Sequence, residues 1–145
     1  MITEDYVSFE IAKLLKKKGF DERCKYVWEL DKANDPQDND GISKICAERF
    51  MEGESFVDNS DIKKVFEYED WFEDYHKVYL CPTLQMTMKW LRKVHHIDIS
   101  IIPLRSHKEY LPRIESDAIS HDAIPCKEYE EACEIAIKYC LEHLI

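Results

Sequence analysis

The chain has 145 residues, of which 45% are hydrophobic and only 3 are glycine, so it can bury a core without metal ions or disulfides. Its formal net charge of −10 disfavours direct binding to nucleic acid or to anionic membrane surfaces. The longest uncharged stretch, Val78–Met88, is too short to cross a bilayer and contains Pro82, so we expect no membrane-spanning segment.

The amino-terminal part predicts a helix followed by a strand. Apolar residues recur at helical spacing over residues 8–18, and the basic run Lys16–Lys18 suits the carboxyl end of a helix dipole. Gly19 is placed to cap that helix. Residues 24–30 alternate and are rich in β-formers, which predicts a strand. The acidic start of the chain lacks the basic and apolar regions of a secretion signal, which favours the cytoplasm.

Residues 31–77 are interpreted as an acidic, variable insertion within a single domain that spans 1–145. Residues 31–75 hold 14 Asp and Glu against 5 Lys and Arg, a balance of −9, whereas the other 100 residues balance at −1. Such a segment is either a solvated face or a surface that imitates nucleic-acid charge and occupies a basic groove of another protein. Residues 31–41 are a run of turn formers. They resemble a calcium loop, but Pro36 and Ala47 stand where its first and last carboxylates belong.

The rest of the insertion gives weaker signals. The pattern predicts a short amphipathic helix over residues 42–51. Asn59–Asp61 serves as a start signal for helical spacing at Ile62 and Val65. The following stretch, residues 66–75, alternates imperfectly and fits a strand or a loop; we favour a strand that ends near Tyr68.

The last 65 or so residues carry the clearest pattern. A helix opens at Pro82, with Leu84, Met88, Leu91 and His95 on its main stripe and Thr87 and Val94 beside it. Residues 97–101 alternate as a strand with one wet face, and Pro103 ends the pairing or marks an edge. A turn near residues 106–108, a strand over 110–115 and a helix over 129–144 complete the chain. The predicted class is α+β, with a small, mostly antiparallel sheet covered by helices in the approximate order α-β-(α)-β-α-β-β-α.

The six cysteines do not predict a metal or redox site. No pair has the Cys-x-x-Cys spacing of zinc and thioredoxin-like sites, and reducing conditions keep thiols free. Cys126, Cys133 and Cys140 recur every seven residues and would share one helix face if the last helix began near Cys126. Neighbouring sulfurs would then lie about 10 Å apart along the axis, so we interpret them as small hydrophobes in a core.

We find no catalytic, metal or cofactor-binding residue to predict, and a protein without catalytic activity is favoured. His95 and His96 are adjacent and point apart, which suits a helix C-terminus better than a chelate. An enzyme would need a pocket that joins His107, His121 or Cys126 to carboxylates.

Three residues are candidates for an interface with a partner. Trp90 and Met86 lie at the border of the main stripe of their helix, where they either cover the edge of the core or anchor a partner. Trp71 is the third candidate, because it is too apolar to be freely solvated within the acidic segment.

One block of the sequence resembles a known group of proteins. Pro82–Met86, continuing into Lys89–Arg92 and followed by an isoleucine-rich strand, is similar to a recurrent block in small uncharacterised proteins of gut-bacterial phages and prophages. The resemblance covers about residues 1–30 and 78–145. The family has no assigned activity, so the resemblance implies an origin, and the host cytoplasm as the location, but no catalytic residues.

These observations favour a non-catalytic accessory protein of a phage or mobile element that acts through protein–protein contacts. The expected partner is an unidentified protein, which the charge would allow to be basic, or a second copy of the chain. Two alternatives stay open. One is an acidic inhibitor that imitates nucleic-acid charge, and the other is a small enzyme with a His, Cys and carboxylate site.

Overall fold

The computed structural model describes residues 4–30, 41–68 and 78–145, and the side chains of 66–68 are not included. The predicted α+β class is confirmed, but the antiparallel strands form two three-stranded sheets instead of one. The chain divides into two compact units. We call Ser8–Pro82 the β1 unit, and Thr83–Ile145 with the residues up to Val7 the β4 unit. None of the helices in the described residues is long and apolar enough to cross a membrane.

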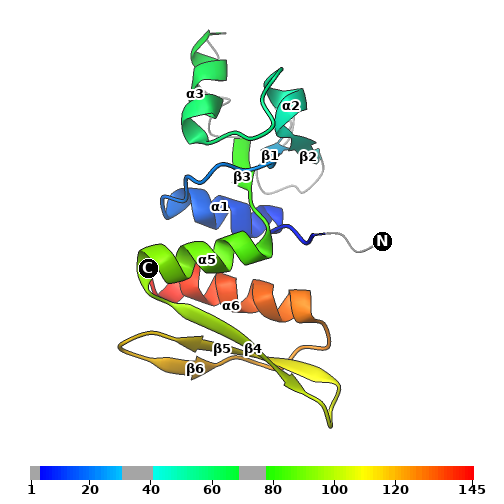
Figure 1. The fold of residues 1–145 in the computed structure, drawn as a ribbon, viewed down its shortest axis with the longest axis vertical. Helices are drawn as coiled ribbons and strands as arrows, with labels where there is room; N and C mark the ends of the chain where they lie inside the picture. The colour runs from blue at the N-terminus through cyan, green and yellow to red at the C-terminus, as the bar shows by residue number, and fades with distance from the viewer. Residues whose placement is uncertain (1–3, 31–40, 69–77) are drawn as a thin grey trace. The chain divides into compact units, whose positions relative to one another are not determined.

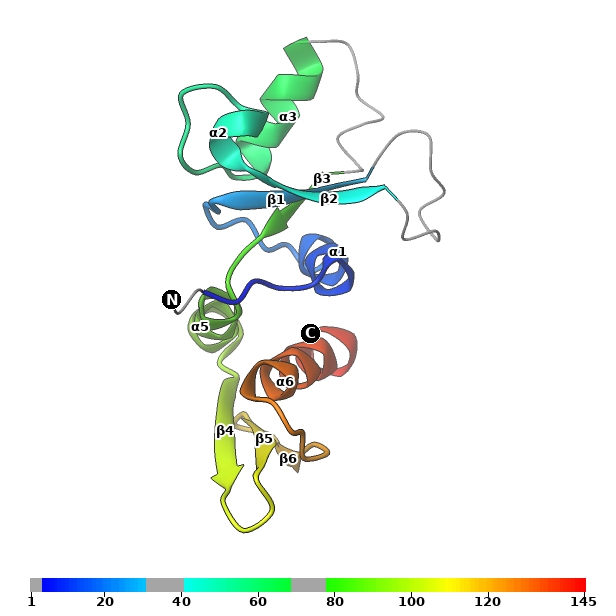
Figure 2. The same ribbon diagram turned by 90° about the vertical axis from the view of Figure 1, so that its right-hand side faces the viewer.

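The β1 unit is a small antiparallel sheet with helices on both faces. Its strand order is β2-β1-β3. Figure 2 shows α1 on one face of this sheet and α2 and α3 on the other. Its elements are α1 (Phe9–Lys17), β1 (Tyr26–Leu30), β2 (Ile42–Cys46), α2 (Ala47–Phe50), α3 (Asn59–Tyr68) and β3 (Val78–Cys81).

Helix α1 confirms the predicted first helix, and local chemistry fixes both of its ends. The Ser8 hydroxyl accepts a hydrogen bond from the Ile11 amide at 3.3 Å, as an N-cap does. At the other end, Gly19 has φ +86°, and its amide donates to the Lys16 carbonyl at 3.2 Å. The Phe20 amide donates to the Leu15 carbonyl at 3.0 Å, which completes a Schellman motif.

The helix predicted over residues 42–51 is wrong in its first half. Ile42–Cys46 is strand β2, which pairs with all five residues of β1, and helix begins only at Ala47. The β-branched residues Ile42 and Ile45 fit both a helical stripe and a strand, so only the β1 partner decides between them. The turn predicted over residues 31–41 lies outside the described residues, apart from Gly41 with φ +87°.

The start signal near Asn59 is confirmed, whereas the strand ending near Tyr68 is wrong because helix α3 continues to Tyr68. The Asp61 amide donates to the Asp58 carboxylate at 3.0 Å, and the Asp58 amide donates to the Asp61 carboxylate at 3.1 Å. This reciprocal pair is a capping box that starts α3 one residue after Asp58. The Asn59 side-chain amide also donates to the Phe20 carbonyl at 3.0 Å, which ties α3 to the end of α1.

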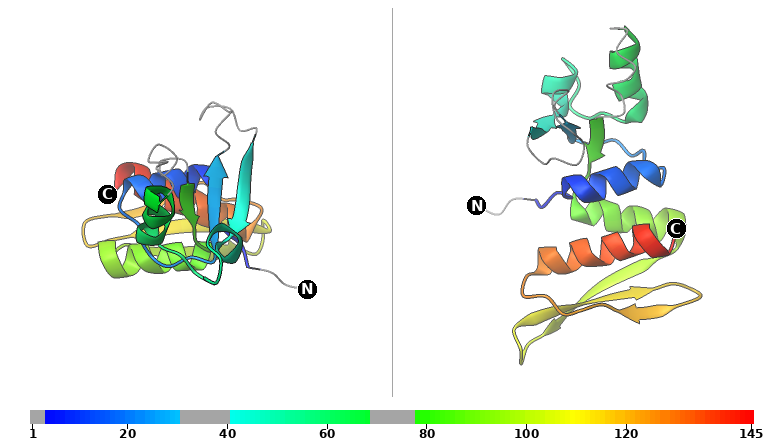
Figure 3. Two further views of the ribbon diagram at one scale, coloured as in Figure 1. Left: turned by 90° about the horizontal axis from the view of Figure 1, so that it is seen from above. Right: turned by 180° about the vertical axis from the view of Figure 1, so that it is seen from behind.

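The β4 unit is a second antiparallel sheet with both of its helices on one face. Its strand order is β4-β5-β6, α6 contacts β4 and β5, and α5 contacts α6 and β4. Figure 1 and the view from behind in Figure 3 show α5 and α6 side by side on this face. Its elements are α5 (Leu84–His95), β4 (Asp98–Leu104), β5 (Glu109–Glu115), β6 (Ser120–Asp122) and α6 (Tyr129–His143).

The predicted anchor helix is confirmed as α5, with two corrections. It begins at Leu84 after the N-cap Thr83, whose hydroxyl accepts from the Met86 amide at 3.0 Å, so Pro82 precedes the cap. The buried side of α5 includes Trp90, whereas Val94, predicted beside the main stripe, is exposed. The buried face of α5 is therefore rotated towards Trp90 and away from Val94, compared with the predicted stripe.

The strands of this unit confirm the predicted hairpin and add one strand. Strand β4 continues to Leu104 and stands at the edge of the sheet, where Pro103 is tolerated because it lacks an amide donor. Strand β6 is too short to give a periodic signal and was not predicted. Helix α6 begins at Tyr129, so Cys126 is not on it; Cys126 forms an isolated bridge with Tyr110 of β5.

Candidate functional site

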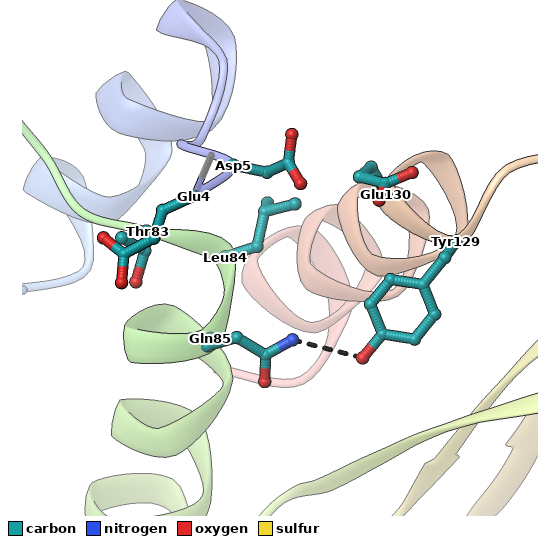
Figure 4. Close-up of a pocket in the computed structure, with 7 residues that line it drawn as sticks. All are labelled: Glu4, Asp5, Thr83, Leu84, Gln85, Tyr129 and Glu130. Carbon is teal, nitrogen blue, oxygen red and sulfur yellow. Dashed lines mark hydrogen bonds between the residues drawn. The ribbon is translucent and has the colours of Figure 1, made fainter. Parts of the chain in front are cut away.

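A pocket of about 220 Å³ lies in the β4 unit where three separate segments meet. The N-terminal segment contributes two acidic residues, the start of α5 contributes three residues, and the start of α6 contributes two. Figure 4 shows Asp5 and Glu130 above Leu84, the Glu4 carboxylate beside Thr83, and the Tyr129 ring opposite Gln85. We call this the acidic pocket; it is lined by Glu4, Asp5, Thr83, Leu84, Gln85, Tyr129 and Glu130.

Backbone contacts hold the N-terminal segment against the start of α5. The Leu84 amide donates to the Asp5 carbonyl at 2.9 Å, and Tyr6 forms an isolated β-bridge with Thr83. The first amides of a helix have no partner within it, so the Asp5 carbonyl satisfies one of them. These contacts hold the backbone of Asp5 against the start of α5.

A side-chain hydrogen bond closes the pocket on the α6 side. The Gln85 side-chain amide donates to the Tyr129 hydroxyl at 3.1 Å (Figure 4). The Tyr129 ring also meets the Tyr110 ring edge-on, with 6.0 Å between centroids. Burial raises the pKa of Tyr129, and the Gln85 hydrogen bond opposes that shift. The phenol is therefore neutral at physiological pH and can offer its oxygen as an acceptor.

The pocket concentrates negative charge around an apolar floor. Glu4, Asp5 and Glu130 supply three carboxylates, while Leu84 is buried beneath them. The positive ends of two helix dipoles favour carboxylates at the starts of α5 and α6, which explains part of this acidity. No group of three His, Cys, Asp or Glu residues able to hold a metal ion is found in the described part of the chain. The arrangement suits an organic cation that carries an aliphatic stem, such as a lysine or arginine side chain.

The structure places two of the three predicted interface residues, and the third lies outside the described residues. Trp90 is buried, and its ring meets His95 edge-on at 4.7 Å between centroids. Met86 is half-buried on the same helix. Neither residue lines the acidic pocket, and Trp71 falls in the range that is not described. The interface role of these residues stays a prediction.

His95 lies in the last turn of α5, in surroundings that disfavour its charged form. Burial lowers its pKa, and the neighbouring His96 lowers it further. Its Nε2 atom is buried and has no hydrogen-bond partner. His95 packs as an aromatic side chain against Trp90, and its lowered pKa disfavours the charged form that would complement the helix dipole.

Two of the residues named for an enzyme site, Cys126 and His121, lie apart along strand β5. Cys126 pairs with Tyr110 of β5, whereas His121 pairs with Ile114 on the same strand, four residues along. At the usual rise of a strand this separates them by about 13 Å. His121 is stacked on the Tyr139 ring, with 4.4 Å between centroids. This packing gives His121 a structural role.

Burial keeps four of the cysteine thiols, in both units, from ionising at neutral pH. It raises the pKa of Cys24 and of Cys140 to about 12 and that of Cys133 to about 11. Burial also raises the pKa of Cys126. A thiol must ionise to act as a nucleophile or metal ligand, so these four are inert at neutral pH. Their packing supports the interpretation of small hydrophobes.

We expect only one of the six thiols to react quickly with a disulfide reagent in the native protein. That thiol is Cys46, because the other five are buried and Cys46 is half-buried. Ellman's reagent at pH 8 is expected to show a fast phase of about one equivalent, and six equivalents in denaturant. The matched control is Cys46→Ser, which removes the fast phase; a fast phase that survives this substitution contradicts the prediction.

Lys16 is the most strongly perturbed cation among the described residues. Its Nζ atom donates to the Val78 carbonyl at 3.0 Å and lies 4.9 Å from the centroid of the Tyr79 ring. Burial lowers the pKa of Lys16 to about 8. The ammonium is still mostly protonated at pH 7, and its contacts join α1 to β3 within the β1 unit, which is a structural role.

The fold and the pocket define a small α+β protein with an acidic pocket at the start of two helices. No family model, curated protein or solved structure matches the chain.

Proposed function

We propose that this chain is a non-catalytic accessory protein of a phage or mobile element that binds another protein, and that the acidic pocket receives a basic side chain of that partner. The likeness of residues 82–92 to phage and prophage proteins supports the origin. The observation that carries the binding role is the convergence of Asp5 and Glu130 over Leu84 and beside Tyr129.

The chemistry of the pocket matches a lysine or arginine side chain in each of its parts. The aliphatic stem would lie on Leu84, and the charged head would lie between the Asp5 and Glu130 carboxylates with the Tyr129 oxygen as a further acceptor. An exposed ion pair contributes only about 0.2–1 kcal/mol, so the pocket supplies selectivity and a faster association, and wider contacts must supply most of the affinity. Binding should therefore weaken as salt is raised.

Site-specific photocrosslinking tests this proposal. Benzoylphenylalanine at Glu4, an exposed residue of the pocket, is expected to crosslink a lysine- or arginine-bearing segment of one protein from a lysate of the host bacterium. The same group at Glu142, near the end of α6, should not capture that segment. Mass spectrometry of the crosslinked peptides identifies the partner protein and the segment of it that lies at the pocket. Identical peptides from both positions, or a partner segment without basic residues, would overturn the proposal.

Charge-matched variants separate the pocket from net charge. Asp5→Asn with Glu130→Gln should reduce the crosslink at least tenfold, because it removes both carboxylates above Leu84. Glu128→Gln with Glu131→Gln is the control. It changes the net charge by the same amount, at positions next to Glu130 at the start of α6, but neither residue lines the pocket. Equal loss in both double variants would show that only overall charge matters.

A further inference from the structure

A second pocket of the β4 unit, of about 420 Å³, has a charge opposite to that of the acidic pocket. It lies where the turn between β4 and β5 approaches the segment before α6, and Figure 1 and the view from behind in Figure 3 show these segments at the same end of the unit. No residue is shared between the two pockets. We call this the cationic pocket, because its lining includes Arg105, Lys108 and Lys127.

Strand pairing holds these three cations around the cationic pocket. Tyr110 and Cys126 exchange backbone hydrogen bonds of 2.7 and 2.8 Å, which sets Lys127 beside the start of β5. Arg105 follows directly after β4, and Lys108 directly precedes β5, so they stand on the two sides of the same turn. Like charges brought together in this way repel one another.

The described part of the chain leaves most of this repulsion uncompensated. Across residues 4–30, 41–68 and 78–145, none of the three cations forms an ion pair. Glu109 also lines the pocket, and its one negative charge against three positive charges leaves a balance of +2. An external anion would relieve this repulsion, and low-dielectric walls around it would strengthen the attraction.

Lys108 holds its position in a backbone conformation that does not suit a lysine. Its φ is +53°, in the left-handed region that glycine and asparagine adopt more readily. The turn alone would therefore favour one of those two residues. A lysine at this position instead brings a positive charge to the pocket lining, which favours a role in binding.

We propose that the cationic pocket binds the phosphate group of a small organic phosphate monoester. Such a group carries about −1.5 to −2 charges at pH 7, which matches the balance of +2, whereas a single carboxylate would match only half of it. The Arg105 guanidinium can donate two parallel hydrogen bonds to phosphate oxygens, and the two lysines supply point charges.

The rest of the lining has room for the organic part of the ligand. A volume of about 420 Å³ falls within the range of small-molecule pockets, about 300–1,000 Å³. Tyr110 and Pro103 line the same pocket and offer ring surfaces. The Tyr110 ring meets the Tyr129 ring edge-on at 6.0 Å between centroids, which restrains it as a contact surface.

The surroundings favour one phosphate group over a polyanion. Three of the four residues after Lys127 are glutamates, and the acidic pocket is close by, because its Tyr129 ring contacts the Tyr110 ring. A nucleic-acid strand or an anionic membrane would bring further negative charges against these carboxylates. A small monoester places its single phosphate among the cations without that repulsion.

Amide NMR titration with inorganic phosphate and with phenyl phosphate, at constant ionic strength, tests the proposal. Both probes are expected to shift the amides of residues 104–110 and 126–128 in a saturable manner. Phenyl phosphate should bind more tightly, because its ring adds contacts with Tyr110 and Pro103. Absence of saturable shifts would overturn the proposal, as would acetate that binds as tightly as phosphate or a DNA duplex that binds more tightly than phenyl phosphate.

Matched variants assign the binding to the cationic pocket. Lys108→Gln with Lys127→Gln should weaken phosphate binding roughly tenfold or more, because two of the three cations are lost. Lys89→Gln with Lys93→Gln changes the net charge equally at exposed positions of α5 and should have no effect. Equal losses in the two double variants would show that only overall charge matters and would overturn the assignment.

A single substitution separates the loss of binding from a loss of folding. Lys108→Asn removes the charge but suits the left-handed backbone better, so the denaturation midpoint should not fall while phosphate binding weakens. A Lys108→Asn protein that binds phosphate as tightly as the original would contradict the role of this lysine.

Discussion

Replacing Phe20 with alanine is expected to lower the free energy of unfolding of the β1 unit by about 3–5 kcal/mol. The Phe20 side chain is 1% exposed and is the largest of the fully buried side chains described. Its removal loses the transfer free energy of the ring and leaves a cavity that the surrounding core can fill only in part. The backbone contacts of Phe20 with Leu15 and Asn59 survive the substitution, so the change isolates the ring.

Chemical denaturation with circular dichroism measures this loss, and hydrogen exchange of α1 and β1 peptides assigns it to the β1 unit. Phe56→Ala is the matched control, because Phe56 lies in the same unit and is 47% exposed. We expect that control to change stability by less than about 0.5 kcal/mol. Comparable losses in both variants would mean that Phe20 does not hold the core of this unit together.

The elements predicted correctly are those whose local signals agree with one another. Helix α1 has a serine cap, an apolar stripe and Gly19 at its end, and α5 has a threonine cap and a similar stripe. Strand β4 alternates from Asp98 to Ile101, and it pairs with β5 over seven residues. Each of these segments specifies its own conformation, so the sequence alone was enough to place them.

Apart from the end of helix α3, the elements that were missed or wrong are short strands whose conformation depends on a partner. Strand β2 was predicted as helix, and β3 and β6 were not predicted at all. These strands have five, four and three residues, too few for a periodic signal. Strand β1 pairs with both β2 and β3, which lie far from it and from each other in the sequence. The pairing of β1 with β2 and β3 is a tertiary contact that local sequence patterns do not show. Because β1 pairs with these two strands and not with β4, β5 or β6, the strands form two separate sheets.

The acidic pocket could not have been found from local patterns. It joins Asp5 to Leu84 and Tyr129, which are separated by some 80 and more than 120 positions in the sequence. The sequence does show acidic residues at the start of the last helix, but such residues are usual at a helix N-terminus and do not by themselves indicate a pocket. The border position of Trp90 allowed it to cover the edge of the core or to anchor a partner, and the structure buries it.

Replacing Leu91 with alanine is expected to lower the free energy of unfolding of the β4 unit by about 3 kcal/mol. Leu91 is fully buried, and its carbonyl accepts from the Ile97 amide at 3.1 Å where α5 turns into β4. Alanine keeps this backbone bond and has a higher helix propensity than leucine, so helix formation itself does not suffer. The loss therefore reports the packing of α5 against the rest of its unit.

Val94→Ala on the same helix is the control that fixes the orientation of α5. Val94 is 53% exposed, and alanine is the better helix former, so stability should stay within about 0.5 kcal/mol of the original. The sequence pattern had placed Val94 beside the buried stripe, and that orientation of the helix requires Val94→Ala to be clearly destabilising. Chemical denaturation of the two variants side by side thus decides whether Trp90 or Val94 borders the core. A Leu91→Ala loss below about 1 kcal/mol would show that this helix is not packed as described.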